Sequence, residues 1–186
     1  MGEIKAYFFD WGSTLASVRE GISTSGTFGD DIKHHLFMGP FHKVPFKSSE
    51  DRELAYRNLS NPEIKLYDDS ETTILELRDK GSKLAIVSNI YEPTVSKICQ
   101  MFPDFIFMFD FTTFSSNVGL VKPDHEIFRY TLRELNKSCN TDIDFSQVVM
   151  VGDNPRADYY PALELGMQAK VIDRIKGETL KGVLGN

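Results

Sequence analysis

Two acidic residues stand directly behind apolar runs of the sequence, where a buried strand would give way to a loop. Asp10 follows the run Ala6–Phe9, and Asp153 follows Val148–Val151 with only Gly152 between them. Ligands of an open parallel sheet bind at the carboxyl ends of its strands, so we expect the two carboxylates to meet at that edge. One carboxylate can attack phosphorus and carry a phosphoryl group, and two neighbouring carboxylates suit Mg²⁺. The pair therefore indicates phosphoryl transfer.

A hydroxyl, an amide and an ammonium group are expected at the same edge. Ser88 and Asn89 follow the apolar run Leu84–Val87, and Lys122 lies between the third and fourth apolar runs. Ser88 and backbone N–H groups can bind phosphate oxygens, and Lys122 can offset the charge of Asp10 and keep it ionised. Taken singly, Ser88 and Asn89 could cap a helix and Lys122 could be a solvated turn residue. Their coincidence at strand ends favours a functional site.

Apolar runs without polar alternation are typical of parallel strands, because both faces of such a sheet are buried. We predict five of them, at Ala6–Phe9, Leu84–Val87, Phe105–Phe109, Val148–Val151 and Ala169–Ile172. Helical patterns lie between them, at Ser70–Lys80, Thr94–Met101, Asp124–Leu135 and Ala157–Leu165. Strands that alternate with helices of this length predict an α/β fold with a doubly wound parallel sheet.

Residues 16–67 interrupt this alternation. The segment is polar and rich in turns and aromatic side chains, and only Ser49–Leu59 has a clear helical pattern. Connections of this length are commonly lids or insertions. We therefore predict a core formed by residues 1–15 and 68–186 and a small inserted cap formed by residues 16–67. The aromatic side chains of the insertion form either an exposed binding surface or, as we favour, the core of the cap itself; they are Phe28, Phe37, Phe41 and Phe46.

Composition limits the partners of the protein. The chain has 186 residues, 41% of them hydrophobic, which is enough for one domain with a core. A net charge of −6 argues against a nucleic acid or an anionic membrane surface as the main partner, and no apolar stretch approaches the length of a membrane span. Cys99 and Cys139 have no motif spacing, so free thiols are expected. We expect a cytoplasmic protein that acts on a small phosphorylated substrate, and no feature specifies an oligomeric state.

Four motifs of the sequence resemble, in order, those of the haloacid dehalogenase-like hydrolase superfamily. They are Asp10-x-x-x-Thr14 behind an apolar strand, Ser88-Asn89 after the second strand, Lys122-Pro123-Asp124, and Gly152-Asp153-Asn154 with Asp158. The resemblance covers residues 4–15 and about 66–175 and leaves out the insertion. It implies the Rossmann-like core of that superfamily, with a cap placed between the first two motifs. Caps at this position are usually larger helical bundles, so a reduced cap and a more open site are expected here.

The resemblance also implies a role for each matched residue in a Mg²⁺-dependent phosphatase. Asp10 would be the nucleophile, with Lys122 orienting Asp10 and the phosphoryl group. Phosphate would be bound by Ser88, Asn89 and Lys122, and Mg²⁺ by Asp10, Asp153 and the backbone carbonyl of Gly12. Thr14 and Asp158 would hold these ligating residues in position without binding the metal or the phosphate themselves, although Asp158 could instead cap the helix that it opens.

Gly12 departs from the phosphatases of the superfamily, which usually have a second Asp there. That Asp protonates the leaving group and then activates water, whereas glycine offers a carbonyl and transfers no proton. General acid–base catalysis contributes roughly 10²–10⁴-fold to a rate, so Gly12 would leave metal and phosphate binding intact and slow turnover. In this first interpretation, water or a histidine of the insertion supplies the proton; the histidines are His34, His35 and His42.

Two further interpretations stay open. The chain could be a weak or silent superfamily member that senses phosphate or binds a protein. It could also cleave a carbon–phosphorus bond, since phosphonoacetaldehyde hydrolases lack the second Asp as well and use a cap lysine as a Schiff base. The available cap lysines are Lys33, Lys43 and Lys47. Dehalogenation ranks last, because the family's dehalogenases work without Mg²⁺ and do not show the acidic pair of Asp153 and Asp158.

Overall fold

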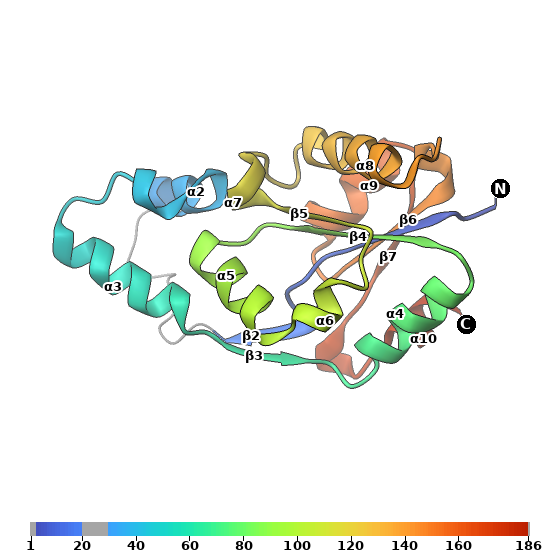
Figure 1. Cartoon of the computed structure of the whole chain (residues 1–186), viewed down its shortest axis with the longest axis horizontal. Helices are drawn as coiled ribbons and strands as arrows, with labels where there is room; N and C mark the ends of the chain where they lie inside the picture. Colours follow the sequence, from blue (N-terminus) through green and yellow to red (C-terminus); the bar gives the residue numbers. More distant parts are fainter. Residues whose placement is uncertain (1–2, 20–29, 186) are drawn as a thin grey trace.

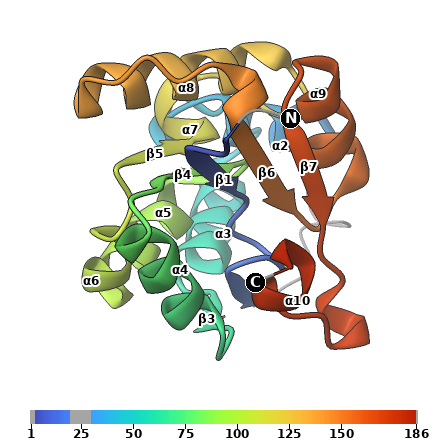
Figure 2. The same ribbon diagram turned by 90° about the vertical axis from the view of Figure 1, so that its right-hand side faces the viewer.

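The computed structural model describes residues 3–19 and 30–185, and within them five strands form a central sheet. The strands lie in the order β5-β4-β1-β6-β7, and every neighbouring pair is parallel. They are β1 (Ala6–Phe9), β4 (Lys83–Ser88), β5 (Phe111–Phe114), β6 (Val148–Gly152) and β7 (Gln168–Val171). Helices cover both faces of the sheet (Figures 1 and 2), which confirms the predicted doubly wound α/β fold.

The central strand β1 shows how both faces of the sheet are buried. Its alternate residues point to opposite faces. Phe8 belongs to the core beneath α8 and α9, whereas Phe9 belongs to the core on the other side, and neither is exposed. The helices of the first face are α8 (His125–Cys139) and α9 (Tyr160–Glu164), and those of the second are α4 (Ser70–Asp79), α5 (Glu92–Met101), α6 (Pro103–Ile106) and α10 (Leu180–Leu184).

The predicted third strand, Phe105–Phe109, is wrong. Pro103 begins the short helix α6 there, and Phe105 and Phe109 pack into the core from this helix and the turn after it. A short apolar run cannot by its pattern alone be distinguished from a buried piece of helix. The strand that pairs with β4 follows directly, at Phe111–Phe114, where two β-branched threonines favour extended backbone.

The other predicted elements lie close to their predicted bounds. The strands at residues 6–9, 84–87, 148–151 and 169–172 correspond to β1, β4, β6 and β7. The helices predicted from Ser70, Thr94 and Asp124 correspond to α4, α5 and α8. The fourth predicted helix, Ala157–Leu165, divides into a π-helical turn, η3 (Pro155–Tyr159), and α9.

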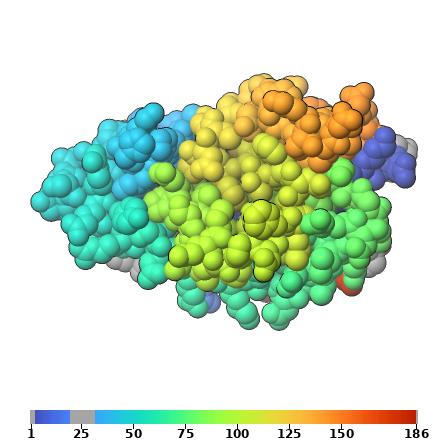
Figure 3. Space-filling view, viewed as in Figure 1, coloured from blue at the N-terminus to red at the C-terminus, as the bar shows by residue number. Residues whose placement is uncertain are grey.

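Residues 16–67 form a two-stranded antiparallel sheet and helices beside one end of the main sheet. The sheet pairs β2 (Ala16–Arg19) with β3 (Glu63–Leu66), and the helices are α2 (Asp30–Met38), the short η1 (Phe41–Lys43) and α3 (Ser49–Ser60). Only α3 was expected from the sequence. Figures 1 and 3 show α2 and α3, blue to cyan, as a lobe at one end of the molecule, where α3 packs against α5 and α2 against α7 (Ser115–Val118).

The lobe has a small apolar core of its own. Leu36, Phe41, Val44, Ala55 and Leu59 are buried there together with Tyr91, and Phe37 and Phe46 pack against them. The expectation that the aromatic side chains form this core is therefore confirmed for three of the four, and Phe28 lies outside the described residues. Cys99 and Cys139 are free thiols, and no helix within the described ranges is long and apolar enough to cross a membrane.

Candidate active site

The loop after β1 is a tight turn that fixes Asp10 at the edge of the sheet. The Asp10 N–H donates to the carbonyl of Val151 on β6, and the N–H groups of Leu15 and Ala16 both donate to the carbonyl of Trp11. The Trp11 ring is fully buried. Ser13 adopts a left-handed conformation with φ 52°, which glycine would take without strain. Backbone hydrogen bonds therefore fix the loop at its start, Asp10, and at its end, Leu15 and Ala16.

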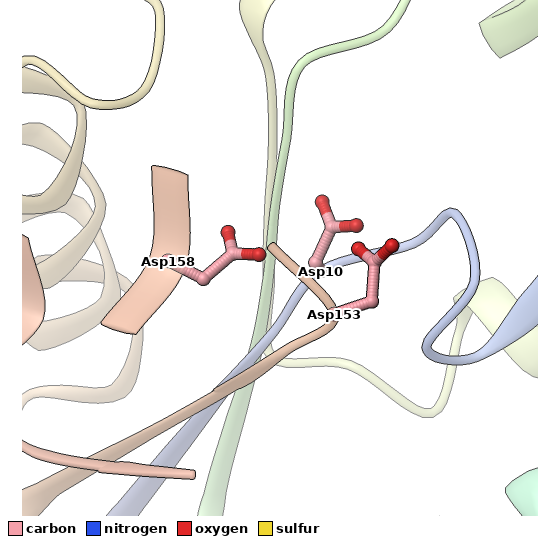
Figure 4. A group of neighbouring side chains, drawn as sticks. All are labelled: Asp10, Asp153 and Asp158. Atoms are coloured by element: carbon pink, nitrogen blue, oxygen red, sulfur yellow. The ribbon is translucent and has the colours of Figure 1, made fainter. Parts of the chain in front are cut away.

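Three carboxylates and one ammonium group gather at this edge. Nζ of Lys122 donates to Oδ1 of Asp10 at 2.6 Å and to Oδ1 of Asp158 at 2.5 Å. Asp10, Asp153 and Asp158 each place a carboxylate oxygen within 4.8 Å of the others. Figure 4 shows Asp10 and Asp153 side by side, at the ends of the chain segments that follow β1 and β6, with Asp158 reaching towards Asp10 from the opposite side.

Asn89 holds the backbone of Lys122. Its Nδ2 donates to the Lys122 carbonyl and its Oδ1 accepts from the Lys122 N–H, both at 2.8 Å. This pair of bonds ties the loop after β4 to the loop before α8, which lie 33 residues apart in the sequence. The geometry favours Asn89 as a residue that positions Lys122, rather than as a phosphate ligand.

Asp158 occupies a space that only a glycine at position 152 leaves open. A Cβ on Gly152 would lie 2.2 Å from Oδ2 of Asp158, far closer than any real contact. The same oxygen accepts from the Asn154 N–H at 3.1 Å. The helical turn that begins at Pro155 is capped by the Asn154 side chain, which accepts from the next two free N–H groups. Asp158 therefore does not cap the helix; its carboxylate faces Lys122.

The cluster carries more negative than positive charge. Burial is the largest cause that raises the pKa of Asp153 to about 6, and the charges of Asp10 and Asp158 raise it further. Burial also raises the pKa of Asp158, against the opposing effect of Lys122. Burial by itself lowers the pKa of Lys122, but Asp10 and Asp158 outweigh burial and raise it, so the lysine stays charged. Three neighbouring carboxylates with a single counter-charge are a donor set that fits a hard divalent cation.

A cavity of about 540 Å³ opens beside Asp10. The core lines it with Asp10, Trp11, Gly12, Ser88, Asn89, Ile90, Tyr91 and Thr94, and the segment 16–67 lines it with Val18, Arg19 and Phe37. Ser88 is only 3% exposed, at the carboxyl end of β4. Ser88, at the end of β4, and Asn89, directly after it, thus line the same cavity as Asp10.

Gly12 is not required by the fold of its loop. A Cβ built there would meet no atom within 4 Å, and Gly12 is not among the residues with positive φ. Neither steric room nor backbone strain therefore excludes a larger residue.

Two arginines near the site had not been expected from the sequence. Arg19 lines the cavity, but it lies in a segment whose pattern matches no family motif. Arg174 donates to the carbonyl of Thr14 through Nε at 3.1 Å and Nη2 at 2.7 Å, and it stacks on the Tyr67 ring at 4.3 Å. It thereby joins both ends of the 16–67 segment to the core. The Thr14 hydroxyl is buried and finds no partner among the described residues.

The candidate proton donors and Schiff-base lysines of the segment 16–67 are not brought to the site. His34 and His35 are exposed, and His42 lines a separate cavity between η1, α3 and α5. Within the residues described, none of the three histidines, nor any of Lys33, Lys43 and Lys47, lines the cavity beside Asp10.

Comparisons with known proteins agree with this geometry. The family described as haloacid dehalogenase-like hydrolase matches residues 4–166. Phosphoserine phosphatase of Thermus thermophilus is 30% identical over 155 residues, which are 83% of this chain and 59% of that protein. The chain therefore spans about 59% of the length of this relative.

Solved structures share the fold at lower identity. A HAD phosphatase from Thermococcus onnurineus matches with a TM-score of 0.60 and 22% identity, over 95% of this chain and 90% of that one. A HAD family enzyme from Bacteroides thetaiotaomicron, solved in complex with magnesium and inorganic phosphate, matches with a TM-score of 0.66 and 16% identity, over 95% and 97% of the two chains. Since the family match covers most of the sequence and includes all four motifs, this chain belongs to the haloacid dehalogenase-like hydrolase family.

Proposed function

We propose that this protein is a Mg²⁺-dependent phosphatase that hydrolyses a phosphomonoester through an aspartyl-phosphate on Asp10. The observation that carries the proposal is the position of Asp10, which lines the cavity while its Oδ1 is held by Lys122 at 2.6 Å. The buried ammonium group holds the Asp10 carboxylate in place, and a carboxylate is a group that can attack phosphorus.

The residues that would hold Mg²⁺ are Asp10, Asp153 and the backbone carbonyl of Gly12. Hard oxygen donors of this kind suit the ion, and the HAD enzyme of Bacteroides thetaiotaomicron binds magnesium together with phosphate. Bound there, Mg²⁺ would neutralise charge on the phosphoryl group. Asp158 is better suited to orienting Lys122, because its two oxygens already accept from Lys122 and from Asn154.

The proposed reaction has two displacements at phosphorus. The Asp10 carboxylate attacks, the bond from phosphorus to the leaving oxygen breaks, and Ser88 and Lys122 bind the phosphoryl oxygens. Water then attacks the aspartyl-phosphate, releases inorganic phosphate and restores Asp10. Gly12 supplies no proton to the leaving oxygen and no base for the water, so both steps rely on solvent in the open cavity and are slow.

We further propose that residues 16–67 act as a reduced cap on a core formed by residues 1–15 and 68–186. Three of the cavity residues come from this segment. Two contacts hold it against α5: the Thr94 hydroxyl donates to the Leu59 carbonyl at 2.9 Å, and the Phe41 N–H donates to Oε2 of Glu92 at 2.5 Å. A cap held in this way would shape the cavity without enclosing it.

A silent phosphate-binding member of the family is the second candidate, and the observation that favours it is Gly12. Cleavage of a carbon–phosphorus bond has less support, since none of the three candidate lysines lines the cavity. The phosphatase and the silent member differ in turnover, because a silent member would bind phosphate but would not hydrolyse a phosphate ester.

Release of inorganic phosphate from phenyl phosphate tests the proposal. The native chain should release phosphate only with Mg²⁺, and Asp10→Asn should abolish release, whereas Asp68→Asn, on a side chain that is 97% exposed, should not. A native rate equal to that of Asp10→Asn would overturn the phosphatase. Binding of inorganic phosphate, measured by calorimetry, would then decide in favour of the silent member.

A further inference from the structure

We infer that Arg19 binds a carboxylate on the leaving group of the substrate, so that the substrate class is the phosphomonoesters of hydroxy acids. The inference rests on the proposed phosphatase activity and adds a specificity residue to it. Arg19 ends strand β2 and lines the same cavity as Asp10 and Ser88.

Among the described residues that line this cavity, Arg19 is the one basic residue and Asp10 the one acidic residue. Lys122 is 5% exposed and is engaged with Asp10 and Asp158, so its charge serves the nucleophile and the phosphoryl group. Within the described part of the cavity wall, an anionic group elsewhere on a bound substrate therefore has a single cationic partner, the guanidinium of Arg19.

The guanidinium of Arg19 is free to take such a partner. Glu63 stands opposite Arg19 in the register of β2 and β3, yet no ion pair or hydrogen bond joins the Arg19 side chain to Glu63 or to any other residue in the described ranges. A solvated arginine that is already placed at the cavity loses little on binding a carboxylate. Its planar fork matches the two carboxylate oxygens.

The rest of the wall is apolar and aromatic. Phe37 from α2 and Tyr91 before α5 stack with ring centroids 4.3 Å apart, and Trp11, Val18 and Ile90 complete the surface. A compact organic leaving group fits a space of about 540 Å³ lined in this way. One guanidinium balances one carboxylate, whereas a second phosphate would add unbalanced charge beside three aspartates. Among the lining residues that the structure describes, a substrate ammonium group would find no acidic partner apart from Asp10.

A matched pair of aryl phosphates tests the inference. 4-Carboxyphenyl phosphate carries the charge, and 4-carbamoylphenyl phosphate is its neutral counterpart of nearly the same shape. We expect kcat/KM of the native chain to favour the carboxylate by about 10-fold, the effect of one charge-assisted hydrogen-bonded pair at a partly exposed site. Arg19→Gln should reduce this ratio to near one. Lys65→Gln, which removes the same charge from the neighbouring strand β3 away from the cavity, should keep it.

A binding measurement separates this inference from the proposed activity. 4-Carboxybenzylphosphonate and 4-carbamoylbenzylphosphonate resist hydrolysis, and calorimetry with Mg²⁺ gives their affinities whether or not the chain turns over an ester. The same preference of about 10-fold, lost in Arg19→Gln and kept in Lys65→Gln, supports Arg19 as the carboxylate site. An equal preference in Arg19→Gln, or none in the native chain, overturns it. Preferential binding with no Asp10-dependent phosphate release would instead refute the phosphatase and leave Arg19 as the site of an anionic ligand.

Discussion

Nζ of Lys122 lies 2.6 Å from Oδ1 of Asp10, and the lysine side chain is only 2% exposed. The contact joins the loop after β1 to the loop before α8, across 112 residues of sequence. Because both side chains are buried, neither charged group can be hydrated in place if its partner is removed. The position of the Asp10 carboxylate therefore depends on a lysine whose own backbone is held by Asn89.

Replacement of this lysine should destabilise the protein severely. Lys122→Met leaves the carboxylates of Asp10 and Asp158 buried without a counter-charge, and removal of one partner from a buried pair costs about 3–5 kcal/mol. Urea unfolding should show this loss, whereas Lys176→Met, at an ion pair whose lysine is 77% exposed, should change the free energy of unfolding far less. Equal losses in the two variants would contradict the buried network.

Gly12 and Gly152, which lie near the three clustered aspartates, should respond differently to replacement by alanine. Gly152→Ala places a Cβ 2.2 Å from Asp158 and must displace that carboxylate from Lys122, at a cost of about 2 kcal/mol or more. Gly12→Ala meets no atom within 4 Å and should change the free energy of unfolding by less than about 1 kcal/mol. Similar unfolding midpoints for the two variants would show that Asp158 does not fill the space at Gly152.

Stability of the metal-free protein should fall as pH rises towards neutrality. The pKa of Asp153 is raised to about 6 in the folded state, so between its ordinary value and about 6 the folded chain binds more protons than the unfolded chain. The penalty for ionising Asp153 is complete above that window. In EDTA at pH 7, Asp153→Asn should therefore be more stable than the native chain, by up to about 1 kcal/mol because the group is partly exposed.

This difference should vanish near pH 4, where Asp153 of the native folded chain is protonated. Mg²⁺ at pH 7 should reverse the order, since it would stabilise the native chain more than the variant. Thermal unfolding in EDTA and in Mg²⁺ measures both effects. A variant that is less stable than the native chain in EDTA would contradict the excess of negative charge at the cluster.

Restoring a carboxylate at position 12 should accelerate turnover. Gly12→Asp has room for its side chain and can transfer the protons that glycine cannot, so kcat for phenyl phosphate should rise by about 10-fold or more. Gly12→Asn has nearly the same shape without the proton and serves as the control. If Asp and Asn variants are equally fast, another group of the native chain already acts as acid and base.

Much of the fold followed from periodicity, since the buried parallel strands are long apolar runs that end in polar residues. Phe105–Phe109 failed because Pro103 starts a helix within an apolar run of ambiguous type. Strands β2 and β3 were not predicted, because four-residue strands paired across 43 intervening residues leave little local pattern.

The proximity of Asp10 and Asp153 was predictable, because each follows the carboxyl end of a strand and the two strands, β1 and β6, are parallel neighbours in the sheet. The contact between Gly152 and Asp158 could not be predicted in this way. It depends on the direction in which the Asp158 side chain points, and the spacing of residues in the sequence does not reveal that direction. Arg19 and Arg174 were missed because they reach the site from segments that carry no motif. The contacts that the segment 16–67 makes with the core therefore could not be predicted from its sequence.

The most direct test of the account is the mass of the protein during turnover. Native chain with Mg²⁺ and phenyl phosphate, quenched in acid, should carry one added phosphoryl group on the peptide that contains Asp10, because Gly12 slows its hydrolysis. Gly12→Asp should show less of this adduct, and Asp10→Asn none. Turnover without any adduct on Asp10, or an adduct that persists in Asp10→Asn, would contradict Asp10 as the nucleophile.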